Sequence, residues 1–498
     1  MEAAPSARDE DVKADAVATA FARAKDAQLA WADLGVAERA SALGKLGARI
    51  LRRANEIGET VARECGKPLE EALLAEVLPN ADLVAYWTKS AEEMLASEEL
   101  ELDALSYPGK SARITREPRG VVALVTPWNY PVAIPLRTLV PALVAGNTVV
   151  WKPSEVTPDT GDLVASLFDG LLPNGVLEIV RGGPETGAEL VASDVDLVVF
   201  TGSVATGKKI AAACAERLIP CSLELGGKDA AVVLADADLE RTARGLVWGA
   251  FTNAGQNCAS IERAYVEKSI ADKLIARIVE LTNELDLERD CAALTTDRQA
   301  DVVRAQLTNA VDSGAVILAG EMPEAGQRRY RPIVVRVVDD NCALMREETF
   351  GPVLPIVVVD DDVEAVKRAN STRYGLTASV WTKSRSRGDD IAKKLRCGVV
   401  TINNHGFTAA IPSAPWTGVG DSGYGITSSI HALAELTRPR LLLDDRSGQK
   451  KELWWYPYTP ALRTIALSMA AVRGGTLLAR VRGLFALLAA FPRRMFEK

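Results

Sequence analysis

The chain of 498 residues has 48% hydrophobic and 25% charged residues, which excludes a disulfide-held mini-protein and a wholly disordered chain and predicts about two to four domains. Its 58 Lys and Arg against 66 Asp and Glu give a net charge of −8, which argues against nucleic acid as a partner, because phosphate binding needs clustered positive charge. Only two histidines exist, His405 and His431, so we expect no histidine-built metal site and look to carboxylates, lysine or cysteine for chemistry near neutral pH.

Residues 11–99 are predicted to form a block of helices, because helix formers dominate and apolar residues recur at spacings of three and four, as at Leu43, Leu46 and Ile50. Residues 102–119 carry short polar and β-branched runs around Pro108-Gly109. This pattern predicts a strand pair around a turn.

From Gly120 the pattern changes to short apolar strands that alternate with helices, which predicts parallel sheets with crossover helices. The first series of predicted strands covers residues 121–125, 148–151, 177–180, 197–200 and 230–234. The second series covers residues 264–266, 315–318, 356–359 and 398–402. We therefore expect an α/β protein with two parallel-sheet domains.

The C-terminal segment, residues 461–498, has a charge opposite in sign to the rest of the chain: six arginines and Lys498 stand against Glu497 alone. Its apolar residues form one helical stripe flanked by Arg480 and Arg482, and the arginines interrupt the run before the ~20 residues that a membrane span needs. Two interpretations stay open: the segment lies on an anionic membrane surface, or it covers an apolar patch of its own or a neighbouring subunit. The stripe consists of Leu477, Leu478, Val481, Leu484, Phe485 and Leu488.

The seven cysteines are odd in number, scattered and without a C-x-x-C pair, so we interpret them as reduced intracellular thiols. Residues 1–11 lack the basic flank and apolar core of a secretory signal, and we expect a cytoplasmic location. The cysteines are Cys65, Cys214, Cys221, Cys258, Cys291, Cys342 and Cys397.

Three side chains stand out as candidates for covalent chemistry. Cys258 follows small polar residues and Gly255, which leave its approach open. Glu224 stands just before two glycines, where backbone can approach a ligand closely. Asn129 follows a predicted strand, at the carboxyl edge of the sheet where ligands collect in open α/β folds.

Two further segments are candidates for a dinucleotide site. Residues 200–207 end a strand and open a helix with Gly202, Ser203 and Gly207, which suits a pyrophosphate, although the G-x-G-x-x-G spacing is absent. Residues 151–155 close another strand with Lys152 and Glu155, which suits the paired hydroxyls of a ribose.

Taken in chain order, these segments resemble the NAD(P)-dependent aldehyde dehydrogenase superfamily over residues 16–438. The resemblance implies an aldehyde dehydrogenase-like α/β fold with two Rossmann-like parallel-sheet domains, a β-hairpin oligomerisation arm and a C-terminal helical tail. The motifs that carry it are the Trp128-Asn129 loop, Lys152-Pro153-Ser154-Glu155, the turn from Gly202 to Gly207, Glu224-Leu225-Gly226-Gly227, Gly255-Gln256-Asn257-Cys258, residues 347–352 and residues 415–425.

The resemblance implies that Cys258 is the nucleophile, Glu224 the general base and Asn129 an oxyanion donor beside the Cys258 backbone amide. A thiolate adds to the aldehyde, hydride leaves to the cofactor, and water activated by Glu224 releases the acid from a thioester. A carboxylate at position 224 favours hydrolysis over transfer to coenzyme A.

The same resemblance implies the cofactor site, with Glu155 favouring NAD over NADP because a carboxylate beside the ribose would repel the extra phosphate. Lys152 and Glu155 would hold the adenine-side ribose and Glu348 the nicotinamide-side one. Ser203, between Gly202 and Gly207, would contact the pyrophosphate, and Phe350 would pack near the nicotinamide. Trp128 and Leu225 complete the expected cofactor set, and no metal is expected.

For the substrate, related semialdehyde dehydrogenases often have an arginine where this chain has Thr252, so a charged tail on the aldehyde is not expected. Tyr130, Ile134 and Trp416 stand where the family lines its aldehyde tunnel, which favours an aliphatic or aromatic aldehyde. The sequence departs from the family at Thr417 and Gly420, where relatives commonly have Gly and Lys.

The resemblance also predicts the domain organisation. We expect an NAD-binding domain at residues 1–99 and 120–226, a catalytic domain at 227–428, an oligomerisation arm at 100–119 and 429–445 that makes a homodimer or homotetramer, and a basic amphipathic tail at 446–498. The alternatives are a semialdehyde dehydrogenase, including a coenzyme A-acylating one, and an inactive nucleotide-binding structural homologue.

Overall fold

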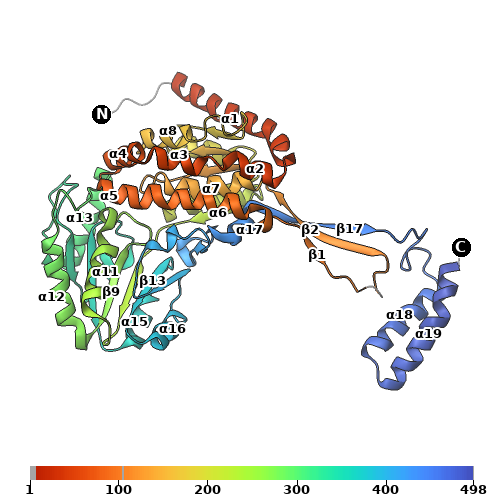
Figure 1. Ribbon diagram of the computed structural model, residues 1–498. Coiled ribbons are helices and arrows are strands. Elements are labelled where there is room, and N and C mark those ends of the chain that lie inside the picture. Colours follow the sequence, from red (N-terminus) through yellow and green to blue (C-terminus); the bar gives the residue numbers. More distant parts are fainter. Residues whose placement is uncertain (1–6, 104–105, 497–498) are drawn as a thin grey trace. The chain divides into compact units, whose positions relative to one another are not determined.

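The computed structural model describes residues 7–103 and 106–496, and the chain divides into two compact units. The larger unit comprises the chain up to Ala96 together with Arg116–Arg440. The smaller unit comprises Ser97–Thr115 together with the chain from Leu441 onward. Strands and helices alternate along most of the larger unit (Figure 1), which confirms the α/β class.

The first sheet of the larger unit has five parallel strands in the order β5-β4-β3-β6-β7. Successive side chains of β3 point to opposite faces of the sheet. Val122 and Leu124 belong to one hydrophobic cluster, whereas Val121 and Ala123 belong to another. Both faces are therefore covered, as a parallel sheet requires. The strands are β3 (Val121–Val125), β4 (Thr148–Lys152), β5 (Leu177–Ile179), β6 (Leu197–Thr201) and β7 (Cys221–Glu224).

Helices from both the N-terminal block and the crossovers surround this sheet. The N-terminal block is α1 (Ala7–Asp33), α2 (Val36–Leu43), α3 (Leu46–Arg52), α4 (Ala54–Cys65), α5 (Leu69–Ala72), the π-helix η1 (Leu73–Val77) and α6 (Leu78–Met94). The crossover helices are α7 (Ala133–Val144), α8 (Pro158–Ser166), α9 (Pro184–Ala192) and α10 (Val204–Glu216).

The second sheet has seven strands in the order β10-β11-β12-β9-β8-β13-β14, all parallel except that β10 runs antiparallel to β11. Its strands are β8 (Asp229–Val233), β9 (Ile261–Glu267), β10 (Val316–Ala319), β11 (Ile333–Arg336), β12 (Val353–Val359), β13 (Thr377–Trp381) and β14 (Val399–Ile402). Its helices are α11 (Leu239–Phe251), the 3-10 helix η2 (Thr252–Gly255), α12 (Lys268–Glu284), α13 (Asp297–Asp312), α14 (Ala343–Arg346), α15 (Asp362–Ala369) and α16 (Arg385–Ala392).

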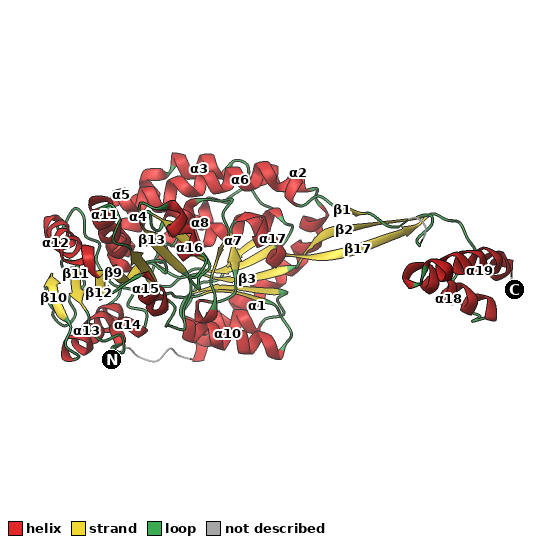
Figure 2. Cartoon of the chain, turned by 90° about the horizontal axis from the view of Figure 1, so that it is seen from below, coloured by secondary structure: helices red, strands yellow, loops and turns green. Residues whose placement is uncertain are grey.

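The remaining elements are several short ones at the end of the larger unit, a three-stranded sheet and two C-terminal helices. The short elements are η3 (Phe407–Ala410), β15 (Trp416–Thr417), η4 (Gly420–Ser422), β16 (Ile426–Thr427) and α17 (Ser429–Leu436). The sheet has the order β1-β2-β17, and Figure 2 shows β2 and β17 side by side. Its strands are β1 (Glu98–Leu100), β2 (Lys110–Pro118) and β17 (Thr437–Asp445), and the last helices are α18 (Pro460–Gly474) and α19 (Leu477–Phe496).

One local expectation needs correction. The strand pair expected within residues 102–119 begins earlier, because β1 is the acidic segment Glu98–Leu100, whose composition carries no strand signal. The expected helical tail is confirmed, and it consists of two helices, α18 and α19, which Gly474 and Gly475 separate. The strands β7, β11 and β13 were not expected as separate strands from the sequence.

Candidate active site

Four of the side chains singled out in the sequence follow or end strands of the first sheet. Asn129 lies in the loop after β3, Lys152 ends β4, Ser203 follows β6, and Glu224 ends β7. Because these strands are parallel, their carboxyl ends meet at one edge of the sheet, where ligands bind in open α/β folds.

Cys258 lines a cavity of about 800 Å³ together with Tyr130, Ile134 and Trp416. It follows η2, which is unusual in having left-handed backbone at both Asn253 and Ala254. The next residue, Gly255, also has a positive φ, and a Cβ there would stand 2.1 Å from the carbonyl oxygen of Gly351. Only glycine permits this close approach of two loops. The structure thus groups the expected nucleophile with all three expected tunnel residues.

Burial, together with the charges of Asp229, Glu224 and Glu348, raises the pKa of the Cys258 thiol to about 12. Arg137 acts in the opposite direction. His405 lies close by, with Nε2 2.6 Å from the carbonyl oxygen of Ala259, but burial lowers its pKa to about 4 and keeps the ring neutral. The Cys258 thiol therefore holds its proton near neutral pH in this state of the protein.

Glu224 is almost fully buried, and its Oε1 has no hydrogen-bond partner. Burial raises its pKa well above the usual range, and the charge of Glu435 raises it further, whereas Arg137 and a hydrogen bond from the Trp416 side chain lower it. Glu224 does not itself line the cavity. It contacts the side chain of Trp416, which does line the cavity. A carboxyl group with one unpartnered oxygen and a raised pKa is suited to take up a proton.

Asn129 is held against the loop that carries Cys258. Its Nδ2 donates to the carbonyl oxygen of Gln256 at 3.1 Å, and its buried Oδ1 has no partner. Asn253 Nδ2 donates in turn to the Asn129 carbonyl oxygen at 3.1 Å. Like Glu224, Asn129 is not in the cavity lining, but its amide contacts the segment two residues before Cys258.

A buried ion pair from the N-terminal helices supports this loop, and sequence reasoning missed it. Lys67 Nζ lies 3.1 Å from Glu76 Oε1, and neither side chain has any solvent exposure. Lys67 also donates to the Asn129 carbonyl oxygen at 2.9 Å, while Glu76 Oε2 accepts from the backbone amides of Val132 and Ala133. Glu76 lies in the π-helix η1, a type of irregularity that often marks functional sites. The sequence signal, two charges nine residues apart in a helical block, is too weak to find such a pair.

Arg137 is a second residue that the sequence analysis overlooked. It lies on α7, close to one helical turn after Ile134, and lines the same cavity as Cys258. Burial lowers its pKa, and its charge interacts with those of Cys258, Glu76 and Glu224. Among residues 7–103 and 106–496, none forms a hydrogen bond or an ion pair with its guanidinium. Its helical spacing from Ile134 would have placed it in the tunnel.

The expected pyrophosphate cradle has the geometry that such a group needs. Ser203 caps α10 by accepting from the Thr206 amide, and the other first-turn amides of the helix lack intrahelical acceptors. A Cβ at Gly202 would stand 2.5 Å from the Phe200 ring, and one at Gly207 would stand 2.6 Å from Leu225. Both positions therefore exclude side chains. Leu225, expected among the cofactor residues, packs under this turn.

The expected ribose and nicotinamide residues lie in two further groups. Lys152 Nζ forms an ion pair with Glu155 at 2.9 Å, and Glu155 is about half exposed. Trp128 and Phe350 pack edge to face, with ring centroids 5.7 Å apart. These contacts fit a dinucleotide that lies along the carboxyl edge of the sheet.

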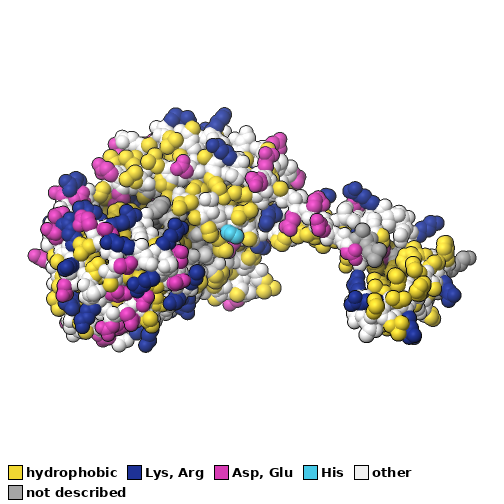
Figure 3. Space-filling model, turned by 60° about the horizontal axis from the view of Figure 1, so that its bottom comes forward, with side chains coloured by type: hydrophobic (Ala, Val, Ile, Leu, Met, Phe, Trp, Pro, Cys, Tyr) yellow, Lys and Arg dark blue, Asp and Glu magenta, His cyan; other side chains and the backbone are white. Residues whose placement is uncertain are grey.

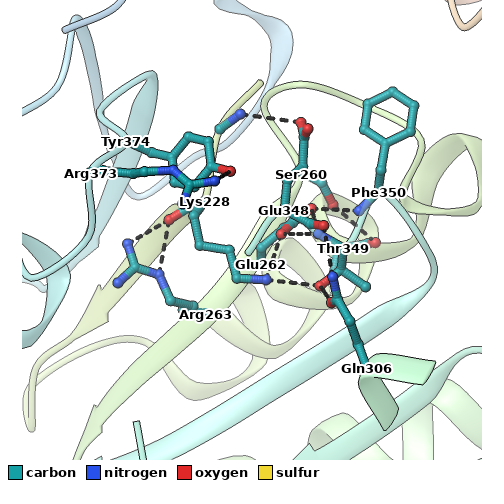
Figure 4. A network of polar contacts seen from close by, with 12 residues as sticks. Lys228, Ser260, Glu262, Arg263, Gln306, Glu348, Thr349, Phe350, Arg373 and Tyr374 are labelled. Atoms are coloured by element: carbon teal, nitrogen blue, oxygen red, sulfur yellow. Dashed lines mark hydrogen bonds and ion pairs between the residues drawn. The ribbon is translucent and has the colours of Figure 1, made fainter. Parts of the chain in front are cut away.

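Glu348 is positioned by a buried polar network (Figure 4). Its Oε1 accepts from the Gly227 amide at 3.2 Å, and a Cβ at Gly226 would approach its carboxylate to 2.3 Å. Beneath it, Lys228 Nζ lies 2.6 Å from Glu262 Oε2, and Glu262 accepts from the backbone amides of the two residues after Glu348. Burial, together with the charge of Glu262, raises the pKa of Glu348 to about 8. Sequence reasoning missed this support because its members are far apart along the chain.

Comparisons with known proteins agree with this geometry. Residues 3–442 match the model of the "Aldehyde dehydrogenase family". The chain is 38% identical to "4,4'-diapolycopene aldehyde oxidase" of Methylomonas sp over 88% of this chain and 83% of that protein. It is 34% identical to a Mycolicibacterium smegmatis protein named "Putative succinate-semialdehyde dehydrogenase", described as NADP(+)-dependent, over 91% and 90%. A solved NAD+ complex of an aldehyde dehydrogenase from Bacillus cereus has a TM-score of 0.83 at 31% identity and covers 87% of this chain and 89% of that one.

Proposed function

The chain belongs to the aldehyde dehydrogenase family and uses NAD(P), and from this premise we propose that it oxidises an apolar aldehyde to the carboxylic acid through a covalent intermediate on Cys258. The observation that carries the proposal is the place of Cys258 in the wall of a cavity that Tyr130, Ile134 and Trp416 also line. A thiol at the wall of a mostly apolar cavity meets the carbonyl of an apolar aldehyde directly.

In the first half of the reaction, Cys258 Sγ adds to the carbonyl carbon as the thiol gives up its proton to solvent water. The oxyanion that forms is stabilised by Asn129 Nδ2 and by the Cys258 backbone amide. When bound, the oxidised cofactor supplies the hydride acceptor and a positive charge near the reacting atoms. Loss of hydride from the former aldehyde carbon leaves a thioester on Cys258.

In the second half, Glu224 removes a proton from water, which attacks the thioester carbon and expels the Cys258 thiolate. The unpartnered Oε1 supports this role, and burial, which raises the pKa of Glu224, makes its carboxylate a stronger base. The sum is aldehyde, NAD+ and water to acid, NADH and a proton.

For the cofactor, we assign Lys152 and Glu155 to the adenine-side ribose, Gly202, Ser203 and Gly207 to the pyrophosphate, and Glu348 to the nicotinamide-side ribose. Phe350, Trp128 and Leu225 would pack around the ring and the turn. The open first turn of α10 and the two glycines that exclude a Cβ support the assignment. We propose a preference for NAD, since Glu155 would face the 2′-phosphate of NADP.

The proposed substrate is a medium-chain, long-chain or aromatic aldehyde. A cavity of about 800 Å³ accommodates such a chain, and the Methylomonas relative is named a 4,4'-diapolycopene aldehyde oxidase. A panel of aldehydes of increasing length, with NADH absorbance as the readout, tests this. We expect kcat/KM to rise with length; a preference for short polar aldehydes would contradict it.

A second candidate is a semialdehyde dehydrogenase, and Arg137 is the observation that favours it. An unpaired guanidinium in the cavity would hold a carboxylate at the far end of the substrate. Succinate semialdehyde belongs in the same panel, and the product separates the remaining alternative: free acid indicates hydrolysis, whereas an acyl-CoA formed with added coenzyme A indicates transfer.

We further propose that copies of the chain associate through the three-stranded sheet and that the enzyme works in the cytoplasm, with the basic tail on a membrane surface. Exposed Leu441 and Leu443 on β17 support the association of copies. Light scattering after size-exclusion chromatography tests it: a dimer or tetramer is expected, and a monomer at micromolar concentration would contradict it.

A further inference from the structure

The hairpin of α18 and α19 leaves a continuous apolar face uncovered. Leu477, Val481, Leu484, Leu488 and Phe491 follow one another at helical spacing along α19, and each is 45–81% exposed. The opposite face of α19 is buried at Gly483 and Ala490, where it meets α18. The apolar residues therefore point away from the helix partner, and Figure 3 shows hydrophobic side chains gathered on this hairpin with dark blue basic groups beside them.

The basic residues stand at the edges of this apolar face. In residues 453–496 the sequence has six arginines and no Asp or Glu. Arg480 and Arg482 lie at helical positions on either side of Val481, and Arg493 continues the second edge. Within the described part of the chain, Arg463, Arg480, Arg482 and Arg493 form no ion pair with an acidic side chain. Their charge is available to an anionic surface.

An aromatic segment is tied to the same hairpin. Trp454, Trp455, Tyr456 and Tyr458 are 47–77% exposed, although aromatic side chains of this size are usually buried. Arg494 of α19 is fully buried and donates to the backbone carbonyl oxygens of Leu453 and Trp455, which fixes the segment to the helix. Tryptophan and tyrosine favour the level of lipid headgroups, where an apolar ring and a polar tip are both satisfied.

We propose that this hairpin docks on a membrane that contains anionic lipid, with the apolar face of α19 among the upper acyl chains, the arginines at the phosphates and the aromatic segment at the headgroups. The inference deepens the membrane association proposed above and rests on it. A charged rim on both sides of a narrow apolar face is the pattern of a helix that lies in the interface plane. No helix among the described residues is long and apolar enough to cross a bilayer.

This surface is a feature of the chain's own C-terminal extension, because the family match ends at residue 442 and the hairpin begins at Pro460. For an enzyme that takes apolar aldehydes, residence on a membrane places it where such substrates accumulate. The other partner that could cover the apolar face of α19 is a second copy of the chain. The experiments below distinguish a lipid surface from a second copy.

The first experiment measures co-sedimentation of the full chain with vesicles of phosphatidylcholine alone and of phosphatidylcholine with phosphatidylserine. We expect binding to the anionic vesicles, at least tenfold weaker binding to the neutral ones, and loss of binding as salt rises. Absence of binding to anionic vesicles at low salt would overturn the proposal.

The second experiment uses the double variant Val481→Glu with Leu488→Glu, whose positions are exposed and so tolerate the change in the folded protein. We expect at least tenfold weaker binding to anionic vesicles and unchanged turnover of a short, water-soluble aldehyde. Leu29→Glu, at a leucine of the larger unit that is 73% exposed, is the control and should bind as the wild type does.

Two results would count against the lipid surface. Unchanged vesicle binding by the double variant would show that this face does not contact lipid. Dissociation of an oligomer by the double variant, measured by sedimentation velocity without lipid, together with no vesicle binding by the wild type, would assign the face to a second copy. Absence of short-aldehyde turnover in the wild type would instead count against the proposed reaction. That result would not bear on whether the hairpin binds lipid.

Discussion

Removing the Glu76 carboxylate tests whether the buried pair with Lys67 positions the Asn129 loop. In Glu76→Ala, Lys67 would keep a charge with no solvent exposure and would lose its ion-pair partner, so that only the charge of Glu71 would act on it, and the amides of Val132 and Ala133 would lose their acceptor. Breaking a buried ion pair in this way costs about 3–5 kcal/mol. We expect a loss of that size in the free energy of unfolding, measured by urea denaturation.

The double variant Lys67→Met with Glu76→Gln separates stability from catalysis. The buried Lys67 charge is removed together with its partner, and the glutamine oxygen can still accept from the amides at the start of α7, so we expect most of the lost stability to return. The Asn129 carbonyl still loses the Lys67 donor, so its side chain is held less firmly. Since one oxyanion donor is worth about 10²–10³ in kcat, we expect kcat to stay at least ~10-fold below the wild type.

The control is Glu56→Ala, which breaks the solvent-exposed pair with Arg53 and should cost less than about 1 kcal/mol. A double variant that regains both stability and full kcat would refute the positioning role. A decrease of less than about 1 kcal/mol in the free energy of unfolding of Glu76→Ala would show that the Lys67–Glu76 pair is accessible to water.

Three further predictions concern specificity and pH. If Arg137 binds a substrate carboxylate, Arg137→Leu should lower kcat/KM for succinate semialdehyde by about tenfold or more relative to an alkyl aldehyde of equal length. An unchanged ratio of the two kcat/KM values would contradict the semialdehyde candidate. Glu155→Ser should raise the NADP/NAD ratio of kcat/KM by about tenfold, and an unchanged ratio would show that this carboxylate does not face the 2′ position. Burial raises the pKa of Asp229 to about 8 from 3.8, so the folded state binds the proton more tightly than the unfolded chain. The stability that this group contributes is therefore present at low pH and is lost as pH rises from about 4 to about 8. Asp229→Asn should flatten that part of a curve of unfolding free energy against pH. If the variant keeps the same slope, another group causes the pH dependence.

The sequence predicted the larger features because their signals are local. Strands such as Val121–Val125 and Thr148–Lys152 are runs of β-branched residues bounded by Gly and Pro, and they lie within a residue of their predicted bounds. Asn129 stood in a short motif after a predicted strand, whereas Glu224 and Cys258 were found through their motifs alone. The placement of Asn129 and Glu224 along one sheet edge follows from the parallel topology.

What the sequence did not predict depends on contacts between distant segments. Lys67 and Glu76 come from the N-terminal helices yet support a loop more than fifty residues further along, and no local pattern announces this. Glu262 likewise holds backbone amides at Thr349 and Phe350. Arg137, by contrast, has a local signal: it lies three residues after Ile134 on α7, so both side chains are on the face that lines the cavity.

The claim on which the reaction depends is a transient covalent bond at Cys258. Intact-mass spectrometry of Glu224→Gln, mixed with NAD and an alkyl aldehyde, tests it most directly, because slow hydrolysis should let the thioester accumulate. We predict a mass increase equal to one acyl group, mapped by peptide analysis to Cys258 and absent when Cys258→Ala is added to the variant. An acyl group on another cysteine, or full turnover by Cys258→Ala alone, would contradict the account.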